Sequence, residues 1–150
     1  MENERNLYHD LDSILYSREE VAAAVRALGE RITADYRGKK PVFICILKGA
    51  SVFFSDLIRQ VDLPLEIEFM AVSSYGASTK SSGEVRLVKD LDRSILDRDV
   101  IIVEDIVDSG VTLSRLLVML KEREPASLRL VTLLDKPARR QAHVDIDYCG

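Results

Sequence analysis

The stretch that decides the fold is Val100–Thr112, which reads VIIVEDIVDSGVT. It opens with four apolar residues, continues with two adjacent carboxylates, Glu104 and Asp105, and adds a third carboxylate at Asp108. A Ser-Gly-x-Thr sequence and the apolar spacing of a helix follow. We therefore expect a buried strand, an acidic loop and a helix start, the place where ligands bind in an open α/β sheet.

This loop suits a sugar phosphate. It lacks the Gly-Lys-Ser/Thr of a P-loop, and the chain has no GxGxxG fingerprint. The amides of residues 108–112 open the expected helix, and a helix N-terminus binds phosphate. Ser109 and Thr112 add hydroxyl donors, and Gly110 lets the backbone approach closely. The two adjacent carboxylates would repel phosphate, so we expect them to face sugar hydroxyls or a divalent cation.

The composition describes one soluble domain. The chain has 150 residues, of which 47% are hydrophobic and 31% charged. The net charge of −4 argues against nucleic-acid and acidic-membrane partners. No apolar run approaches the ~20 residues that span a bilayer, and no signal peptide is evident. We expect a cytoplasmic protein without nucleic-acid or membrane partners.

The alternation of strand and helix patterns predicts an α/β fold. Ser17 and Glu20 predict a capping box at the start of the first helix. The small polar residues at 74–83 predict a mobile loop. The result is a doubly wound, mostly parallel sheet with helices on both faces. Helices are expected at 17–36, 50–61 and 111–122, and strands at 41–47, 65–72, 84–88, 100–103, 128–134 and 144–149.

The central stretch resembles the phosphoribosyl-diphosphate loop of the type I phosphoribosyltransferases, and the hypoxanthine-guanine branch in particular. The resemblance covers residues 12 to 150. It implies the fold of that family and transfer of a 5-phosphoribosyl group from phosphoribosyl diphosphate to hypoxanthine or guanine, giving IMP or GMP and pyrophosphate. Three further segments agree in order: Ile46–Ala50 resembles the pyrophosphate loop, Ser73–Gly76 the mobile flap, and Leu133–Pro137 the purine-reading strand end.

The resemblance gives the central loop its roles. Asp108 is the expected general base for the proton that the purine loses; a helix N-cap is the alternative. Glu104 and Asp105 are expected to hold the ribose hydroxyls and Mg²⁺, the alternative being a solvated strand end. Contacts to phosphoribosyl diphosphate are expected at Lys48, Gly49, Asp108, Ser109, Gly110, Val111 and Thr112.

The same resemblance predicts roles for residues in two other loops. A cis peptide bond is expected between Leu47 and Lys48, and Lys48 is expected to stabilise the departing pyrophosphate; an exposed lysine in an ordinary turn is the alternative. Ser74 and Tyr75 are expected at the root of a flap that closes over the reacting centre and excludes water. Tyr75 is otherwise a simple turn residue.

The expected purine contacts lie near the end of the chain. Lys136 can donate a hydrogen bond to the exocyclic oxygen of a 6-oxopurine, which favours hypoxanthine and guanine over adenine. Ile106 is expected to pack against the base. Arg140 matches an arginine of the family and is a further candidate for the purine site, the alternative for Arg140 and its neighbour Arg139 being surface solvation.

The resemblance also predicts what the domain formed by residues 1–150 lacks. The family continues with an aromatic residue that stacks on the purine, whereas this sequence stops at Gly150. We therefore expect the purine-covering C-terminal segment to be missing. The resemblance also implies that the protein forms a homodimer or homotetramer and acts on small-molecule substrates.

Two alternatives of another kind stay open. A signalling receiver domain also has Val-Glu-Asp after an apolar strand and Lys-Pro after a later one, but only 45 residues follow Asp105. The second is an RNA-binding regulator with the phosphoribosyltransferase fold, against which Asp108 and the acidic net charge speak.

Overall fold

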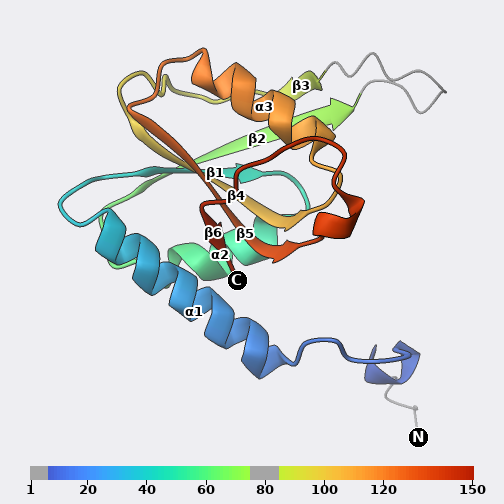
Figure 1. The fold of residues 1–150 in the computed structure, drawn as a ribbon. Coiled ribbons are helices and arrows are strands. Elements are labelled where there is room, and N and C mark those ends of the chain that lie inside the picture. Colours follow the sequence, from blue (N-terminus) through green and yellow to red (C-terminus); the bar gives the residue numbers. More distant parts are fainter. Residues whose placement is uncertain (1–6, 75–84) are drawn as a thin grey trace, which may run out of the picture.

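A six-stranded sheet with helices on both faces forms the body of the computed structural model, which describes residues 7–74 and 85–150 (Figure 1). The predicted fold class is therefore confirmed. The elements in chain order are η1 (Leu7–Asp10), α1 (Arg18–Asp35), β1 (Val42–Ile46), α2 (Ser51–Ile58), β2 (Glu66–Ser74), β3 (Val85–Lys89), β4 (Asp99–Val107), α3 (Val111–Lys121), β5 (Ser127–Asp135), η2 (Pro137–Arg139) and β6 (Tyr148–Cys149).

The strand order is β3-β2-β1-β4-β5-β6. Strand β1 pairs in parallel with β2 on one side and with β4 on the other, while β3 runs antiparallel to β2. After β1 the chain therefore builds outward in one direction, returns, and continues from β4 in the other direction. The carboxyl ends of β1 and β4 flank this switch point, where ligands bind in sheets of this kind.

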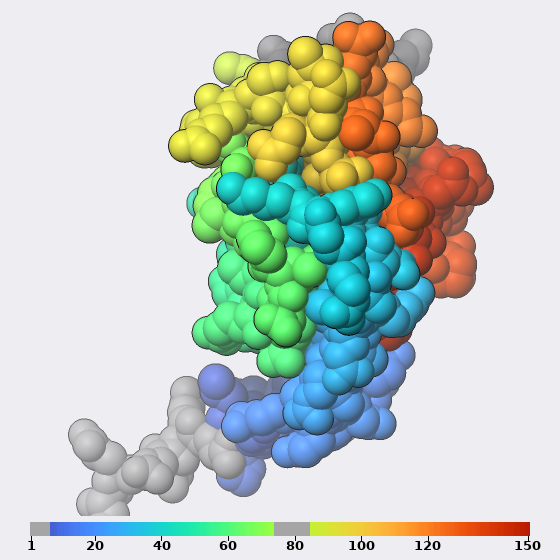
Figure 2. Space-filling view, turned by 90° about the vertical axis from the view of Figure 1, so that its left-hand side faces the viewer, coloured from blue at the N-terminus to red at the C-terminus, as the bar shows by residue number. Residues whose placement is uncertain are grey.

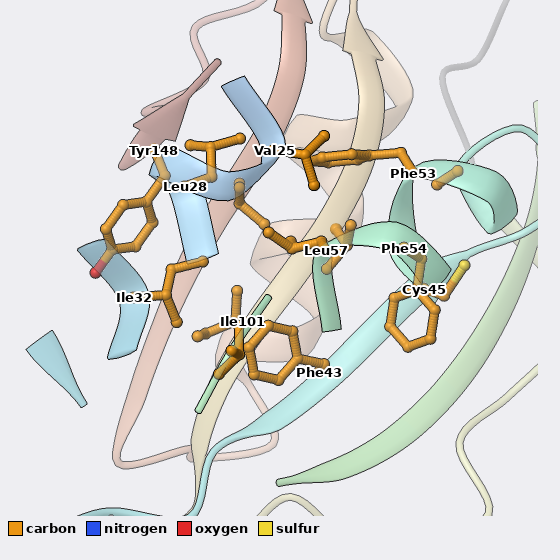
Figure 3. Packing of buried hydrophobic residues seen from close by; sticks show 14 of the residues in the cluster. Val25, Leu28, Ile32, Phe43, Cys45, Phe53, Phe54, Leu57, Ile101 and Tyr148 are labelled. Carbon is orange, nitrogen blue, oxygen red and sulfur yellow. The ribbon is translucent and has the colours of Figure 1, made fainter. Parts of the chain in front are cut away.

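Two hydrophobic cores fix the sheet between its helices. Figure 3 shows the core that α1 and α2 cover, where Leu28 and Leu57 pack against Phe43 of β1 and Ile101 of β4. The second core joins the opposite face of the sheet to α3 through Leu113, Leu116 and Leu120. Both central strands are buried on their two faces, which explains their continuous apolar runs.

The first helix begins as the sequence predicts. The Ser17 side chain accepts a hydrogen bond from the Glu20 amide at 3.1 Å, and the Glu20 carboxylate accepts one from the Ser17 amide at 2.7 Å. These two bonds are the predicted capping box. They fix the point at which α1 starts across the face of the sheet.

Two expected boundaries are wrong. Residues 104–107 are strand and not loop, because β4 stays paired with β5 as far as Val107, opposite Asp135. The strand expected at 144–149 is reduced to Tyr148–Cys149. Just before these residues, the Leu130 amide of β5 donates to the Asp147 side chain at 2.8 Å in place of a strand carbonyl, so the ladder with β5 begins at Tyr148, opposite Val131.

The mobile loop predicted at 74–83 falls almost entirely outside the described residues. Its two ends are described: Ser74 closes β2 and Val85 opens β3, and the two residues are partners in the antiparallel pair. The expected strand at 84–88 is confirmed in position as β3. Tyr75, expected in the flap, lies outside the described residues.

Candidate functional site

The loop after β1 brings a lysine to the switch point. The amide of Leu47 donates to the Met70 carbonyl at 2.8 Å, so the chain stays paired until the loop begins. A cis peptide bond joins Leu47 and Lys48, which confirms that expectation. Lys48 and Gly49 are both exposed.

The same loop lies directly against the carboxylate of Asp105. A Cβ atom placed on Gly49 would lie 3.2 Å from Oδ2 of Asp105. Glycine therefore lets the β1 loop approach the end of β4 more closely than most side chains would allow. Lys48–Gly49 and Asp105, separated by more than fifty residues in the sequence, form one surface.

Glu104 and Asp105 are held on β4 by strand pairing, with Glu104 opposite Thr132 of β5. The Ile106 amide donates to Oδ1 of Asp105 at 2.9 Å, which orients that carboxylate. Burial, and then the negative charge of Asp105, raise the pKa of Glu104 to about 8. Two adjacent carboxylates at this depth favour a bound cation, because a cation offsets their repulsion.

The donor set fits Mg²⁺ better than a metal held by protein alone. No cluster of three or more His, Cys, Asp or Glu side chains that could hold a metal exists among residues 7–74 and 85–150. A cation beside Glu104 and Asp105 would therefore take its remaining oxygens from substrate and water. Mg²⁺ is commonly bound in this way, through one or two carboxylates and substrate phosphates.

Helix α3 presents an open N-terminus to the same end of the sheet. Its N-cap is Gly110, a residue with no side chain that could cap the helix. Asp108 is therefore not the N-cap, so the structural alternative for this residue is wrong. The hydroxyl of Ser109 accepts a bond of 3.4 Å from the Val111 amide. The first amides of an α-helix have no partner within the helix, so they are available to an anion.

Position 110 requires glycine for two reasons, its backbone conformation and the lack of space around it. Its φ of +76° lies in the left-handed region. A Cβ atom there would lie 2.7 Å from the Ala142 carbonyl oxygen and 2.9 Å from Cγ2 of Val144. The segment after η2 thus packs tightly on the loop that opens α3.

Asp108 has contacts that the sequence did not reveal. Nε of Arg139 lies 3.2 Å from Oδ1 of Asp108, and Nε of Arg140 donates to the Asp108 carbonyl at 3.0 Å. The Asp108 side chain is 43% exposed, so a substrate can reach it. The alternative considered for these arginines, simple surface solvation, is wrong, because both contact Asp108. Their position shortly after Lys136–Pro137 indicated that they lie near the site. The sequence did not show that Asp108 is their partner.

Lys136 and Ile106 approach this loop from two neighbouring strands. The Lys136 amide donates to the Val107 carbonyl at 2.8 Å, which holds the end of β5 beside the end of β4. The Lys136 side chain is exposed, and the described residues provide it with no ion pair or hydrogen bond. Ile106, paired with Leu134, is half-buried.

A small cleft gathers these side chains between β4 and α3. Its volume is about 160 Å³. The expected site residues that do not line it are Lys48, Gly49, Asp105, Val111, Lys136 and Arg140. Of Ser74 only the backbone position is described. Six expected site residues line the cleft: Glu104, Ile106, Asp108, Ser109, Gly110 and Thr112.

Larger cavities lie elsewhere, along the N-terminal segment and α1. Their volumes are about 430 and 760 Å³. The Asp56 carboxylate in the first of them is already paired with Arg59 at 2.6 Å. Size alone is therefore a poor guide here, because the smaller cleft holds six of the expected site residues.

Comparison with known proteins agrees with this geometry. The family described as phosphoribosyl transferase domain matches residues 12–150. A hypoxanthine-guanine phosphoribosyltransferase of Bacillus subtilis is 49% identical over 142 residues, which are 95% of this chain and 79% of that protein. A crystal structure of a hypoxanthine phosphoribosyltransferase from Staphylococcus aureus has a TM-score of 0.92 at 44% identity, over 99% of this chain and 81% of that one.

Some relatives are much longer. The bifunctional protein TilS/HprT of Listeria innocua is 48% identical over 145 residues, and the chain spans 22% of its length. The comparisons do not favour a receiver domain or an RNA-binding regulator. Among the described residues, no helix is both long and apolar enough to cross a membrane.

Proposed function

The chain belongs to the phosphoribosyl transferase domain family, and from this premise we propose that it transfers the 5-phosphoribosyl group of phosphoribosyl diphosphate to hypoxanthine or guanine. The C1′–O bond to pyrophosphate breaks, and a bond from C1′ to a ring nitrogen of the purine forms. The products are IMP or GMP and pyrophosphate. The reaction belongs to purine salvage.

The observation that carries this proposal is the meeting of three features at one switch point. The open N-terminus of α3, the carboxylates of β4 and the Lys48–Gly49 loop lie together at the carboxyl ends of two adjacent parallel strands. Phosphoribosyl diphosphate has a phosphate at one end, a pyrophosphate at the other and hydroxyls between them. The three features match these three parts in chemistry.

The two charged ends of the substrate bind at separate places. Asp108, Ser109, Gly110, Val111 and Thr112 form the 5′-phosphate loop, with backbone amides as the main donors. Lys48 and Gly49 bind the pyrophosphate, whose charge grows as it leaves, and the ammonium group stabilises that charge. The Lys48 side chain is exposed and has no ion pair within the described part of the chain, so it is available for this role.

Glu104 and Asp105 bind the ribose hydroxyls and would hold Mg²⁺. When bound, Mg²⁺ supplies positive charge to the pyrophosphate oxygens. The hydrogen bond from the Ile106 amide keeps one carboxylate of the pair oriented. Their position at the strand end, and not on a free loop, restricts the ribose to a narrow range of orientations.

Asp108 acts as the general base. The purine loses a ring proton as the new bond to carbon forms, and the Asp108 carboxylate accepts it. Lys136 donates to the exocyclic oxygen of the base, and Ile106 packs against its ring. Adenine carries an amino group in place of that oxygen, so it would leave the lysine without an acceptor.

The proposal also covers the oligomeric state and the cellular location of the protein. We expect a homodimer or homotetramer in the cytoplasm. In a solved structural neighbour, the hypoxanthine phosphoribosyl transferase of Trypanosoma cruzi, the C-terminal region has a role in oligomeric state and enzymatic activity. Light scattering of the purified protein measures the oligomeric state directly.

A direct assay tests the proposed activity. The protein is incubated with phosphoribosyl diphosphate, Mg²⁺ and one of hypoxanthine, guanine, adenine or orotate, and nucleotide formation is followed chromatographically. We expect IMP and GMP at rates well above that of AMP, and no orotidine nucleotide. Preference for adenine or orotate, or no nucleotide with any base, would overturn the assignment.

A further inference from the structure

The segment after β5 is tied to the 5′-phosphate loop at three successive carbonyls. The Val107 carbonyl accepts from the Lys136 amide at 2.8 Å, and the Asp108 carbonyl accepts from Nε of Arg140 at 3.0 Å. The Ser109 carbonyl accepts from two amides of the same segment, at 2.8 and 3.0 Å. The middle bond differs from the others because its donor is a side chain.

Arg140 is anchored at its other end as well. Its Nη2 pairs with the carboxylate of Asp135, the last residue of β5. The side chain is only 20% exposed, and its stem runs past Gly110, where an added Cβ would lie 3.0 Å from Cδ of Arg140. The guanidinium therefore joins the end of the strand that precedes Lys136 to the main chain of Asp108.

We propose that Arg140 is a positioning residue: it fixes the Asp108 peptide relative to the base-reading end of β5, so that the carboxylate meets the purine held by Lys136. This rests on the proposed function. The role differs from the direct purine contact considered from the sequence, because the described polar contacts of the guanidinium are to the protein. The planar guanidinium can hold two partners in fixed directions at once, which an ammonium cannot match.

The consequence should fall on turnover more than on binding of phosphoribosyl diphosphate. The two backbone bonds to Ser109 do not depend on the side chain at position 140, so the amides that open α3 keep their support. The Asp108 peptide loses the bond that Arg140 donates. General-base catalysis depends on orientation, and a small misplacement of the base is costly.

Arg139 offers a weaker means of orienting the same residue. Its ion pair with the Asp108 carboxylate joins side chains that are 69% and 43% exposed. Exposed pairs of this kind stabilise little. Arg140, with a half-buried stem and two fixed partners, is the stronger constraint on Asp108.

The test uses Arg140→Met, Arg140→Lys and Asp135→Asn, with Arg93→Met as a control on the exposed β3–β4 connection. We expect Arg140→Met to lower kcat by about 10- to 100-fold while KM for phosphoribosyl diphosphate changes by less than about threefold. Arg140→Lys should recover part of kcat, because it keeps the charge beside Asp135. Arg93→Met should match the unmodified protein.

A second measurement does not depend on activity. The backbone order parameter of Ser109, from ¹⁵N relaxation of the ligand-free protein, reports the mobility of the Asp108–Ser109 peptide. We expect it to fall from about 0.85 to below about 0.6 in Arg140→Met and to stay high in Arg93→Met.

The possible results distinguish a wrong role for Arg140 from a wrong proposed function. An unchanged kcat in Arg140→Met, or an unchanged order parameter, would overturn the positioning role. A raised KM for the purine with kcat intact would point to direct purine contact and would also overturn it. If the unmodified protein makes no nucleotide, the proposed function fails, and the order parameter still decides whether Arg140 fixes the Asp108 peptide.

Discussion

Charged groups lie at both ends of the parallel strands, but their partners differ. At the amino ends, on the side that Figure 2 faces, Glu66 pairs with Arg98 at 3.0 Å and with Lys40 at 3.1 Å. Asp99 accepts a hydrogen bond of 2.6 Å from Ser127. The charges at this end have protein partners.

At the carboxyl ends several polar groups are left for something else. Within residues 7–74 and 85–150, the exposed side chains of Lys48 and Lys136 have no ion pair and no hydrogen bond to the protein. The N-cap of α3 is Gly110, which has no side chain to cap the helix. Burial and the neighbouring Asp105 raise the pKa of Glu104, and no ion pair in the described residues offsets its charge. We infer that this end of the sheet binds a polar ligand, whereas the charged pairs at the other end stabilise the fold.

The largest expected effect compares two aspartates near opposite ends of β4. We expect Asp108→Asn to lower kcat by about 10²- to 10⁴-fold, the usual loss when a general base is removed, while phosphoribosyl diphosphate still binds. Asp99→Asn should leave kcat unchanged and cost about 1 kcal/mol of folding stability through the weakened bond to Ser127. Steady-state kinetics and thermal unfolding of both variants provide the comparison. Equal kcat values for the two variants would remove Asp108 from the mechanism and erase the difference between the ends.

The second expected effect concerns metal-dependent binding. The double variant Glu104→Gln/Asp105→Asn should bind phosphoribosyl diphosphate with Mg²⁺ at least about tenfold more weakly, because a carboxylate is a far better ligand for Mg²⁺ than an amide. The matched double variant Glu66→Gln/Asp99→Asn also removes two negative charges, but at the amino ends of the strands. It should bind phosphoribosyl diphosphate normally. Isothermal titration with Mg²⁺ and with chelator measures both. Binding by the unmodified protein that is equally strong in chelator would contradict the metal role.

The third effect compares two glycines with nearly the same backbone conformation. Gly38 has a φ of +79° and nothing within 4 Å of an added Cβ, whereas the Cβ on Gly110 would collide with the Ala142 carbonyl. Gly38→Ala should cost about 1–2 kcal/mol through conformational strain alone. Gly110→Ala should cost more, and should also weaken binding at the 5′-phosphate loop.

Urea unfolding gives the two stabilities, and titration with phosphoribosyl diphosphate gives the binding. If Gly110→Ala is no more destabilising than Gly38→Ala, the packing of the 140–144 segment on the loop is looser than the structure indicates.

Much of this fold could be predicted from the sequence because local signals coincide with tertiary ones. The apolar runs of β1 and β4 fit strands buried on both faces, and the capping box of Ser17 and Glu20 marks the start of α1. The end of β4 was missed because pairing with β5 extends it through two carboxylates. The strand at 144–149 was overestimated because the Leu130 amide of β5 bonds the Asp147 side chain in place of a strand carbonyl, so strand pairing begins at Tyr148.

The site divides in the same way. Glu104, Asp105 and Asp108 lie in one short stretch, so the sequence alone could predict that they act together. The contacts of Arg139 and Arg140 with Asp108 span about thirty residues and depend on how the end of β5 packs beside β4. The approach of Gly49 to Asp105 is likewise a product of strand order, and no local pattern encodes it.

The smallest expected effect tests whether the charges at the amino ends serve stability. Hydrogen bonds from Arg98, and then from Lys40, hold the pKa of Glu66 below its ordinary value of 4.5. A carboxylate whose pKa is lowered by folding stabilises the native state above its unfolded pKa, and this contribution is lost as the pH falls through the folded value. The difference in Tm between the unmodified protein and Glu66→Gln should therefore be positive near pH 7 and shrink as the pH drops below about 4.5. High salt should reduce it, because the pair is partly exposed and screened. Thermal unfolding at several pH values, with kcat as a parallel readout at neutral pH, completes the comparison. A loss of kcat in Glu66→Gln without a change in Tm would show that the amino ends of the strands also serve the reaction.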